Sequence, residues 1–153
     1  MKKLKNKLKN KSIVIYLIYN KALNIEEYIM LADLKDITLL VVEDDLFNRK
    51  LIQAMLSKNE HINIVEAGDG EEALALLNEK DIDALLLDIH MPKMNGFEML
   101  KILRADEKHK KLPVIVITSD EVERKKSFSL GADAFLPKPF RLNELENKVY
   151  NIL

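Results

Sequence analysis

The stretch Asp83-Ala-Leu-Leu-Leu-Asp88 decides the fold of this chain, because it joins an apolar run directly to an acid. A short run without polar residues at alternate positions is typical of a strand that is buried on both faces of a sheet. The stretch Ile37-Thr-Leu-Leu-Val-Val42 has the same character, and Glu43 and Asp44 follow it at once. The two stretches therefore predict buried strands that end on acids.

Three more short apolar runs fit the same pattern, and each strand is followed by a segment whose apolar residues recur at helical spacing. The further predicted strands are Ile62–Glu66, Pro113–Thr118 and Ala134–Pro137. Among the predicted helices, the first ends near Lys58, the fourth runs from about Glu121 to Leu130, and the last runs from Leu142 to Ile152. Five βα units in series predict an α/β fold, a doubly wound five-stranded parallel sheet with helices on both faces.

Polar residues and glycines mark the ends of several predicted helices. Asp45 has Asn48 three residues later, which fits the N-cap of the first helix. Ser119 and Asp120 are suitable caps for the fourth helix, and Gly131 is positioned to end it. These signals predict short connections between the elements.

The composition fits one globular domain with a substantial core. The 153 residues are 48% hydrophobic and 32% charged, a balance that does not suit a disordered chain. The chain has no cysteine, so disulfides, thiolate chemistry and cysteine-ligated zinc are excluded. No two of its three histidines have the spacing of a helical metal pair.

The first 35 residues differ from the rest and predict a basic and apolar N-terminal extension ahead of a domain over residues 36–153. Residues 1–21 hold seven Lys and no acid, which leaves 17 basic and 25 acidic residues in the rest of the chain. This acidic excess argues against nucleic acid as the main ligand, because phosphate binding needs clustered Lys and Arg. It is compatible with a site that binds a cation.

The apolar run at residues 13–19 of the extension is far shorter than the roughly 20 residues that span a bilayer. No small-x-small cleavage site follows the run, so a secretory signal is not favoured. The extension could instead contact anionic membrane lipid or a partner through its Lys residues. We favour a poorly ordered extension or a start codon assigned too early, with Met30 as the later start.

Four of the predicted strands deliver chemically capable side chains to their carboxyl ends. Glu43 and Asp44 follow the first strand, Asp88 ends the third, Thr118 ends the fourth, and Lys138 comes just after the fifth. In doubly wound sheets, ligands bind outside the carboxyl ends of the strands. Taken singly, each residue also fits a helix cap, a core hydroxyl or a solvated lysine. Their joint placement at one edge favours a functional site.

The chemistry of this residue set is that of phosphoryl transfer. Three neighbouring carboxylates repel one another and favour a hard cation with oxygen ligands, for which Mg²⁺ is the natural choice. A carboxylate such as Asp88 can act as a nucleophile and form an acyl phosphate. The Lys138 ammonium and the Thr118 hydroxyl can then stabilise the charge on the transferring group.

With these residues at the strand ends, the chain closely resembles the receiver domain of bacterial response regulators in two-component signalling, over about residues 36–153. The matching segments are Leu39-Leu-Val-Val-Glu-Asp-Asp45, Leu85-Leu-Leu-Asp-Ile-His-Met-Pro-Lys-Met-Asn-Gly96, Val114-Ile-Val-Ile-Thr-Ser119 and Gly131-Ala-Asp-Ala-Phe-Leu-Pro-Lys-Pro-Phe140. The resemblance implies the flavodoxin-like receiver fold with strand order 2-1-3-4-5. It also implies a cytoplasmic signalling module, not an ordinary enzyme.

The resemblance implies that Asp88 is the phosphorylated residue and that Mg²⁺ is the cofactor. Asp44 is similar to the direct ligand of the ion, and Glu43 to its partner, which acts mainly through bound water. The backbone carbonyl of His90 is similar to the third protein ligand, beside Asp88 itself. The side chains of His90 and Asp120 occupy positions that tune phosphate lifetime in the family, although the His90 imidazole also fits an exposed loop side chain.

The resemblance also implies a switch. Thr118 resembles the hydroxyl residue that moves onto the phosphoryl group, and Lys138 the lysine that pairs with Asp88 or its phosphate. Phe135 matches the aromatic residue that changes rotamer, although it lacks the hydroxyl of the more usual Tyr. The Lys138-Pro139 peptide bond is expected to be cis, which proline makes energetically accessible.

A receiver of this kind accepts its phosphoryl group from a histidine kinase or a histidine phosphotransfer protein. The chain ends at Leu153, directly after the predicted fifth helix, so we expect a single-domain regulator without an output domain. We expect it to signal by altered binding of a downstream protein at the face of the fourth helix, fifth strand and fifth helix, through which receivers also dimerise. A phosphorelay role, in which phosphate passes to another histidine, is the alternative.

Two other functional classes fit the residues less well. An Asp-nucleophile phosphohydrolase of the haloacid-dehalogenase type uses a second acid two residues after the nucleophile, where this chain has His90. A receiver that works unphosphorylated as an interaction module would not need the intact set of Glu43, Asp44, Asp88, Thr118 and Lys138.

Overall fold

The structure, a computed structural model, describes residues 36–153 of the chain. The predictions for the extension at residues 1–35, including its membrane contact and its start codon, lie outside the described residues. The strands are β1 (Ile37–Val42), β2 (Ile62–Ala67), β3 (Ala84–Asp88), β4 (Val114–Thr118) and β5 (Ala134–Pro137). The helices are α3 (Leu46–Leu56), α4 (Gly70–Glu79), α5 (Gly96–Ala105), α6 (Arg124–Ser129) and α7 (Leu142–Ile152), and a 3₁₀ turn, η1, spans Glu121–Glu123.

The five strands form one parallel sheet in the order β2-β1-β3-β4-β5. The central strand β3 lies between β1 and β4, with Leu85 in register with Leu40 on one side and Val114 on the other. The strand order switches direction between β1 and β3, because β2 is added on one side of this pair and β4 and β5 on the other. Ligands of doubly wound sheets bind at such a switch point. The predicted α/β fold with strand order 2-1-3-4-5 is confirmed.

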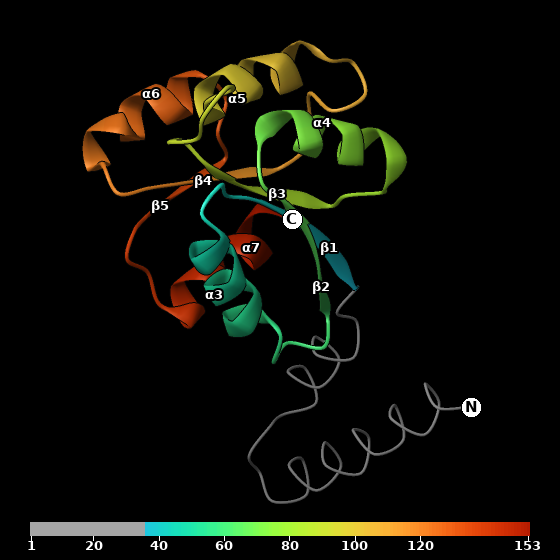
Figure 1. The fold of residues 1–153 in the computed structure, drawn as a ribbon, viewed down its shortest axis with the longest axis vertical. Coiled ribbons are helices and arrows are strands. Elements are labelled where there is room, and N and C mark those ends of the chain that lie inside the picture. Colours follow the sequence, from blue (N-terminus) through green and yellow to red (C-terminus); the bar gives the residue numbers. More distant parts are fainter. Residues whose placement is uncertain (1–35) are drawn as a thin grey trace, which may run out of the picture. The chain divides into compact units, whose positions relative to one another are not determined.

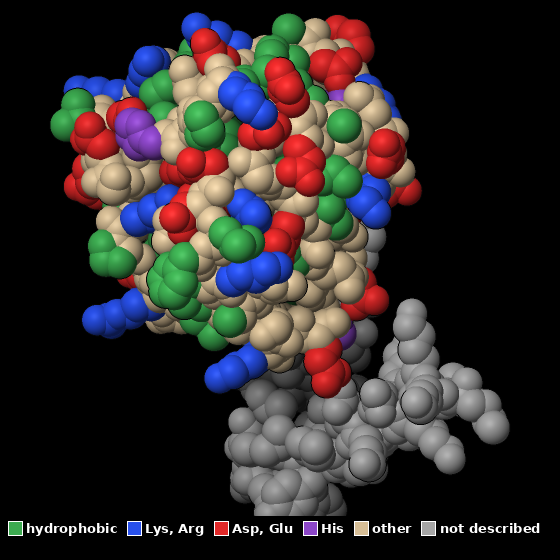
Figure 2. All heavy atoms as spheres, in the orientation of Figure 1, with side chains coloured by type: hydrophobic (Ala, Val, Ile, Leu, Met, Phe, Trp, Pro, Cys, Tyr) green, Lys and Arg blue, Asp and Glu red, His purple; other side chains and the backbone are tan. Residues whose placement is uncertain are grey.

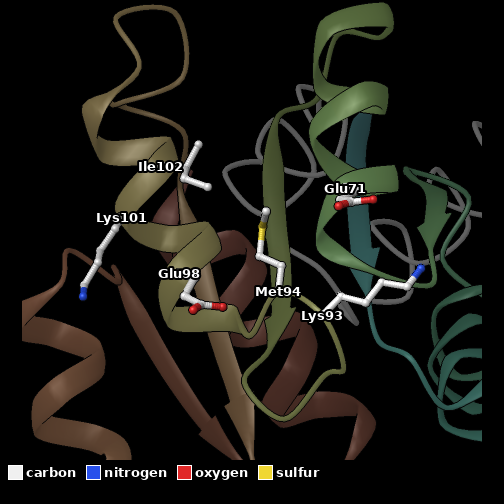
Figure 3. Close-up of a pocket in the computed structure, with 6 residues that line it drawn as sticks. All are labelled: Glu71, Lys93, Met94, Glu98, Lys101 and Ile102. Carbon is white, nitrogen blue, oxygen red and sulfur yellow. The ribbon is translucent and has the colours of Figure 1, made fainter.

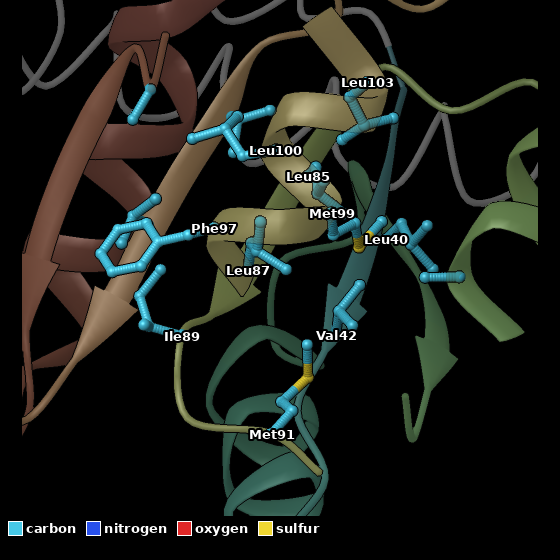
Figure 4. Packing of buried hydrophobic residues seen from close by; sticks show 14 of the residues in the cluster. Leu40, Val42, Leu85, Leu87, Ile89, Met91, Phe97, Met99, Leu100 and Leu103 are labelled. Carbon is cyan, nitrogen blue, oxygen red and sulfur yellow. The ribbon is translucent and has the colours of Figure 1, made fainter. Parts of the chain in front are cut away.

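Helices cover both faces of the sheet, with α4, α5 and α6 on one side and α3 and α7 on the other (Figure 1). On the first face, α5 residues such as Leu100 pack against strand residues such as Leu85, as Figure 4 shows. On the second face, Ile52 of α3 and Leu145 of α7 pack against Leu86 and its neighbours. Adjacent residues of one strand are therefore buried on opposite faces, which explains the continuous apolar runs.

The fourth helix is shorter than predicted. The segment expected as one helix over about Glu121–Leu130 forms the 3₁₀ turn η1 and then the short helix α6. Only Ser127 in these two elements is buried, so core packing does not enforce a longer α-helix here. Asp120 caps η1 by accepting from the Val122 N–H at 2.9 Å, and Gly131 follows α6 with a φ of 99°.

Helix α3 has apolar side chains both inside and outside the core. Ile52 and Leu56 are buried against the sheet. Leu46, Phe47 and Leu51 are exposed on the same helix, and Phe47 has 76% of its surface in solvent. The first two turns of α3 therefore present an apolar surface outside the core.

The face of the described residues that Figure 2 shows is mixed in charge. On the face in Figure 2, Lys and Arg side chains are interspersed with Asp and Glu, and the described residues of that face form no continuous basic surface. A surface that binds nucleic acid requires clustered basic side chains. None of the helices within residues 36–153 has the length and apolar content that a bilayer crossing requires.

Candidate functional site

Three carboxylates meet at the carboxyl edge of the sheet. Glu43 and Asp44 follow β1, and Asp88 ends the neighbouring strand β3. One carboxylate oxygen from each residue lies within 4.8 Å of the others. Glu43 and Asp88 are buried, with 1% and 4% of their surfaces exposed, whereas Asp44 is exposed. The cluster is therefore buried at its base and open to solvent on the side of Asp44.

Local contacts fix the acidic turn after β1. The Glu43 N–H donates to a carbonyl of β2 at 3.2 Å, which continues the sheet by one residue. Arg49 of α3 donates through Nη1 to the Glu43 carbonyl at 2.5 Å and to the Asp44 carbonyl at 3.3 Å. Asp45 caps α3 by accepting from the Asn48 N–H at 2.8 Å, as predicted. The third acid of the turn is thus used as a cap, which leaves Glu43 and Asp44 for the site.

Lys138 follows β5 and reaches across the sheet edge to the acids. Its Nζ atom lies 2.5 Å from Glu43 Oε2 and 3.2 Å from Asp88 Oδ1. Burial alone lowers the pKa of Lys138, but the hydrogen bond to Glu43 and the charge of Asp88 outweigh it, so its pKa is raised. The ammonium therefore stays charged at neutral pH and partly neutralises the cluster. The Lys138-Pro139 peptide bond is cis, as predicted.

Asp88 has the chemical character of a reactive carboxylate. Burial raises the pKa of its carboxyl to about 6; the charge of Lys138 opposes this rise and the charge of Glu43 adds to it. At pH 7 most molecules still have an ionised Asp88, as nucleophilic attack requires. A buried acid with a raised pKa at the ligand-binding edge of the sheet is a candidate functional group.

Thr118 ends β4, and its buried hydroxyl contacts a residue that the sequence analysis does not select. Thr118 Oγ1 donates to Glu123 Oε2 at 2.8 Å, and the same Glu123 oxygen lies 3.1 Å from His90 Nε2. The Asp120 N–H donates in turn to Thr118 Oγ1 at 3.2 Å. Sequence reasoning misses Glu123 because it lies in a highly charged segment. Its place one tight turn after Thr118 is the only signal that could have indicated it.

The other predicted residues lie around the cluster with different exposures. Phe135 of β5 has only 2% of its surface exposed, and the Arg124 guanidinium lies 5.0 Å from the centre of its ring. The His90 and Asp120 side chains are exposed in the loops after β3 and β4. The structure thus brings together Glu43, Asp44, Asp88 and Lys138, and it joins Thr118 and His90 through Glu123.

A hollow on another part of the surface does not contain these residues. It has a volume of about 470 Å³, and its lining residues are Glu71, Lys93, Met94, Glu98, Lys101 and Ile102 (Figure 3). The hollow has no member of the predicted site. Its Lys93 is directed to Asp69, with Nζ and Oδ2 3.4 Å apart, and not to the acidic cluster. The candidate site is therefore the acidic cluster at the sheet edge.

Comparison with known proteins gives the family. The family model described as the response regulator receiver domain matches residues 39–150, which contain the whole acidic cluster and Lys138. The chain belongs to the response regulator receiver family. Receiver domains of this family serve in two-component signalling systems, so the predicted resemblance is confirmed.

Curated relatives of this receiver include two kinds of protein. The transcriptional regulatory protein CpxR of Escherichia coli is 44% identical over 117 residues, which cover 75% of this chain and 48% of that protein. The chemotaxis protein CheY homolog of Campylobacter jejuni is 34% identical over 118 residues, which cover 75% of this chain and 91% of that protein. The matched receiver thus spans about half the length of CpxR and most of the length of the CheY homolog.

Solved receivers share the fold. Chemotaxis protein CheY4 of Vibrio cholerae has a TM-score of 0.71 and 28% identity, covering 76% of this chain and 98% of that one. A putative response regulator of Chloroflexus aurantiacus has a TM-score of 0.73 and 32% identity, covering 77% and 98%. The receiver domain of a Pseudomonas aeruginosa sensor histidine kinase, with a magnesium ion coordinated in its active-site cleft, has a TM-score of 0.69 and 27% identity, covering 75% and 95%.

Proposed function

We propose that this receiver accepts a phosphoryl group on Asp88 from the phosphohistidine of a histidine kinase or of a histidine phosphotransfer protein. The observation that carries the proposal is a buried carboxylate at the end of the central strand, 3.2 Å from a lysine ammonium and beside two further acids. This combination supplies a nucleophile, a fixed positive charge and oxygen ligands for a cation at one point.

The transfer exchanges one bond to phosphorus for another. An Asp88 carboxylate oxygen forms a bond to phosphorus, the bond from phosphorus to the donor imidazole breaks, and its electron pair returns to the imidazole nitrogen. Lys138 contacts Asp88 and can neutralise charge on the phosphoryl oxygens. The Thr118 hydroxyl can donate to the same group after it leaves Glu123. Water reverses the modification by hydrolysing the acyl phosphate.

Mg²⁺ fits the donor set, because three close carboxylates offer the hard oxygen ligands that this ion prefers. We propose Asp44 and Asp88 as direct ligands, Glu43 as a ligand through water, and the backbone carbonyl of His90 as the third protein ligand. The bound ion would supply positive charge beside the transferring phosphoryl group. The magnesium-containing receiver of the Pseudomonas kinase supports this proposal.

The exposed apolar surface of α3 supports a protein as the phosphodonor. Leu46, Phe47 and Leu51 are exposed on α3, which begins two residues after Asp44. A phosphohistidine carried by a protein must dock beside the open side of the acidic cluster. Apolar side chains there would contribute affinity that a small-molecule donor does not need.

We propose that the output is altered binding of a downstream protein at the face formed by α6, β5 and α7. The phosphoryl group carries about two negative charges and would draw Thr118 and Lys138 toward Asp88. Phe128 of α6 and Val122 of η1 are exposed apolar residues close to this face, which supports partner binding or dimerisation. Transfer of the phosphate to another histidine is the alternative output.

The high coverage of the Campylobacter CheY homolog supports a stand-alone receiver, whereas the half coverage of CpxR fits a receiver within a longer regulator. We favour the stand-alone form. Mass measurement of the natural protein in host extracts tests this, because an added output domain would nearly double its size.

Labelled acetyl phosphate with Mg²⁺ tests the phosphoacceptor role. Wild type and Asp81→Asn should take up label equally, because Asp81 is an exposed acid ahead of the opposite end of β3. Asp88→Asn should take up none. Label retained by Asp88→Asn would overturn the assignment. Rapid release of phosphate from a small phosphoester by the wild type would favour a phosphohydrolase instead.

A further inference from the structure

The Thr118 hydroxyl is fully engaged in this structure. A threonine hydroxyl has one proton to donate. That proton is donated to Glu123 Oε2 at 2.8 Å, and the Asp120 N–H donates to the hydroxyl oxygen at 3.2 Å. Thr118 can therefore donate to a phosphoryl group on Asp88 only after its bond to Glu123 breaks.

The same Glu123 oxygen also engages His90. The His90 Nε2 atom lies 3.1 Å from this oxygen, which is within ion-pair distance. His90 comes from the loop after β3, and Thr118 from the end of β4. Glu123 therefore contacts both the loop after β3 and the end of β4, and both contacts are made by one carboxylate oxygen.

Contacts of its backbone fix the position of Glu123. Its carbonyl accepts from the hydroxyl of buried Ser127 at 2.9 Å, and its N–H donates to the Asp120 carbonyl at 3.2 Å. Glu123 stands at the N-cap of α6, yet its side chain makes no capping hydrogen bond. The Glu123 side chain has only 18% of its surface exposed. Its place in the fold is therefore explained by Thr118 and His90, and not by helix capping.

Phe135 is already buried while Thr118 still contacts Glu123. Of the two residues of the expected switch, Phe135 is therefore already in a buried position, whereas Thr118 has not moved toward Asp88. The aromatic ring needs no further inward movement, whereas the Thr118 hydroxyl is still held by Glu123.

We propose that Glu123 is a positioning residue that restrains the unphosphorylated receiver by holding the Thr118 hydroxyl and the His90 ring. This inference rests on the proposed phosphorylation of Asp88. A contact that exists only in the unphosphorylated state opposes the phosphorylated one by its full free energy. Removal of the carboxylate then favours phosphorylation, although it removes a hydrogen bond from the protein.

The test is the initial rate of label uptake from acetyl phosphate at a subsaturating concentration with Mg²⁺. Glu123→Ala should raise this rate about threefold to tenfold, the range expected for the net contribution of one typical hydrogen bond. Glu123→Gln retains an oxygen that can accept from Thr118, and it should fall between Ala and wild type. Glu121→Ala is the matched control, because Glu121 is an exposed acid of the same 3₁₀ turn. It should leave the rate unchanged.

A double-mutant cycle separates positioning from a general structural effect. In a Thr118→Val background, Glu123→Ala should change the rate by less than about twofold, because the Thr118 hydroxyl is already absent and only the His90 contact is left. A full effect of Glu123→Ala in that background, or an unchanged rate in the wild-type background, overturns the restraint. Absence of label from wild type and every variant overturns the proposed function and the restraint with it, whereas label in wild type with no effect of Glu123 overturns the restraint alone.

Discussion

Lys138 lies closer to Glu43 than to Asp88, with its Nζ atom 2.5 Å from the Glu43 carboxylate and 3.2 Å from that of Asp88. Asp88 therefore shares its only close ammonium, among the residues that the structure describes, with a second buried acid. Burial outweighs this shared attraction at Asp88, whose pKa rises to about 6. The site thus has more negative than positive charge, and we expect this excess to lower its stability and to favour a cation.

Asp88→Asn should stabilise the receiver in the absence of Mg²⁺. The pKa of Asp88 in the folded state, about 6, lies above its usual 3.8, so folding favours the neutral carboxyl. The stabilisation that the neutral Asp88 carboxyl gives to the folded state is fully present below the usual pKa, and it is lost as pH rises through about 6. At about pH 7.5 we expect a gain of roughly 1–2 kcal/mol in the free energy of unfolding, which allows for partial solvation of the carboxyl.

Urea unfolding at about pH 4 and about pH 7.5 measures this difference, which should nearly vanish at the lower value. Asp81→Asn is the control and should show no pH-dependent gain, because its side chain is exposed. An equal gain for Asp88→Asn at both pH values would show that carboxyl ionisation is not the cause.

Mg²⁺ should stabilise the wild type, because an ion that binds only the folded state raises the free energy of unfolding. We expect roughly 1–3 kcal/mol at concentrations well above the dissociation constant. Asp44→Asn should remove most of this gain. Asp45→Asn should keep it, since Asp45 caps α3 and Asn caps equally well. Thermal unfolding with and without Mg²⁺ measures both variants, and a normal response from Asp44→Asn would exclude Asp44 as a main ligand.

Lys138→Met should destabilise the receiver by about 2–4 kcal/mol at neutral pH, because it leaves two buried carboxylates without a close counter-charge. Loss of the ammonium raises the pKa of Asp88 further, so the stability deficit should grow as pH rises and shrink in acid. Lys125→Met is the control, because Lys125 is exposed on α6. Chemical denaturation across pH measures the effect. A deficit that is constant with pH would indicate lost packing and not lost charge.

Gly96→Ala should destabilise the site through a steric clash. A Cβ at position 96 would lie 2.3 Å from the Asp88 carbonyl oxygen and 2.9 Å from the Ile89 Cα. Both neighbours are backbone atoms, so we expect a loss of about 2–4 kcal/mol despite the better helix propensity of Ala. Gly68→Ala is the matched control, because its nearest contacts are side-chain atoms at 3.5 Å. Equal unfolding midpoints for the two variants would contradict the close approach.

The strands and the acidic cluster could be predicted because their signals are local. The run Ile37–Val42 is buried on both faces, and Glu43 and Asp44 follow it directly, so the strand end and the acids are visible together. The contact of Thr118 with Glu123 depends instead on a 3₁₀ turn that replaces a predicted helical turn. Side-chain direction there follows from tertiary packing, which periodicity does not describe.

The length of α6 failed as a prediction for a related reason. Its segment offers helical composition and good caps, but only Ser127 is buried, and most helix stability in proteins comes from packing of an apolar face. The partner preference of Lys138 was likewise beyond sequence reasoning, since Glu43 and Asp88 are both acids within its reach.

The most direct measurement is site-specific trapping of the acyl phosphate. The receiver is incubated with acetyl phosphate and Mg²⁺, reduced with borohydride, which converts an aspartyl phosphate to homoserine, and mapped by peptide mass spectrometry. We predict homoserine at position 88 in an amount that follows phosphate uptake, with Asp44 and the other acids unchanged. Homoserine at another position, or phosphate uptake without homoserine at position 88, would contradict the assignment of Asp88.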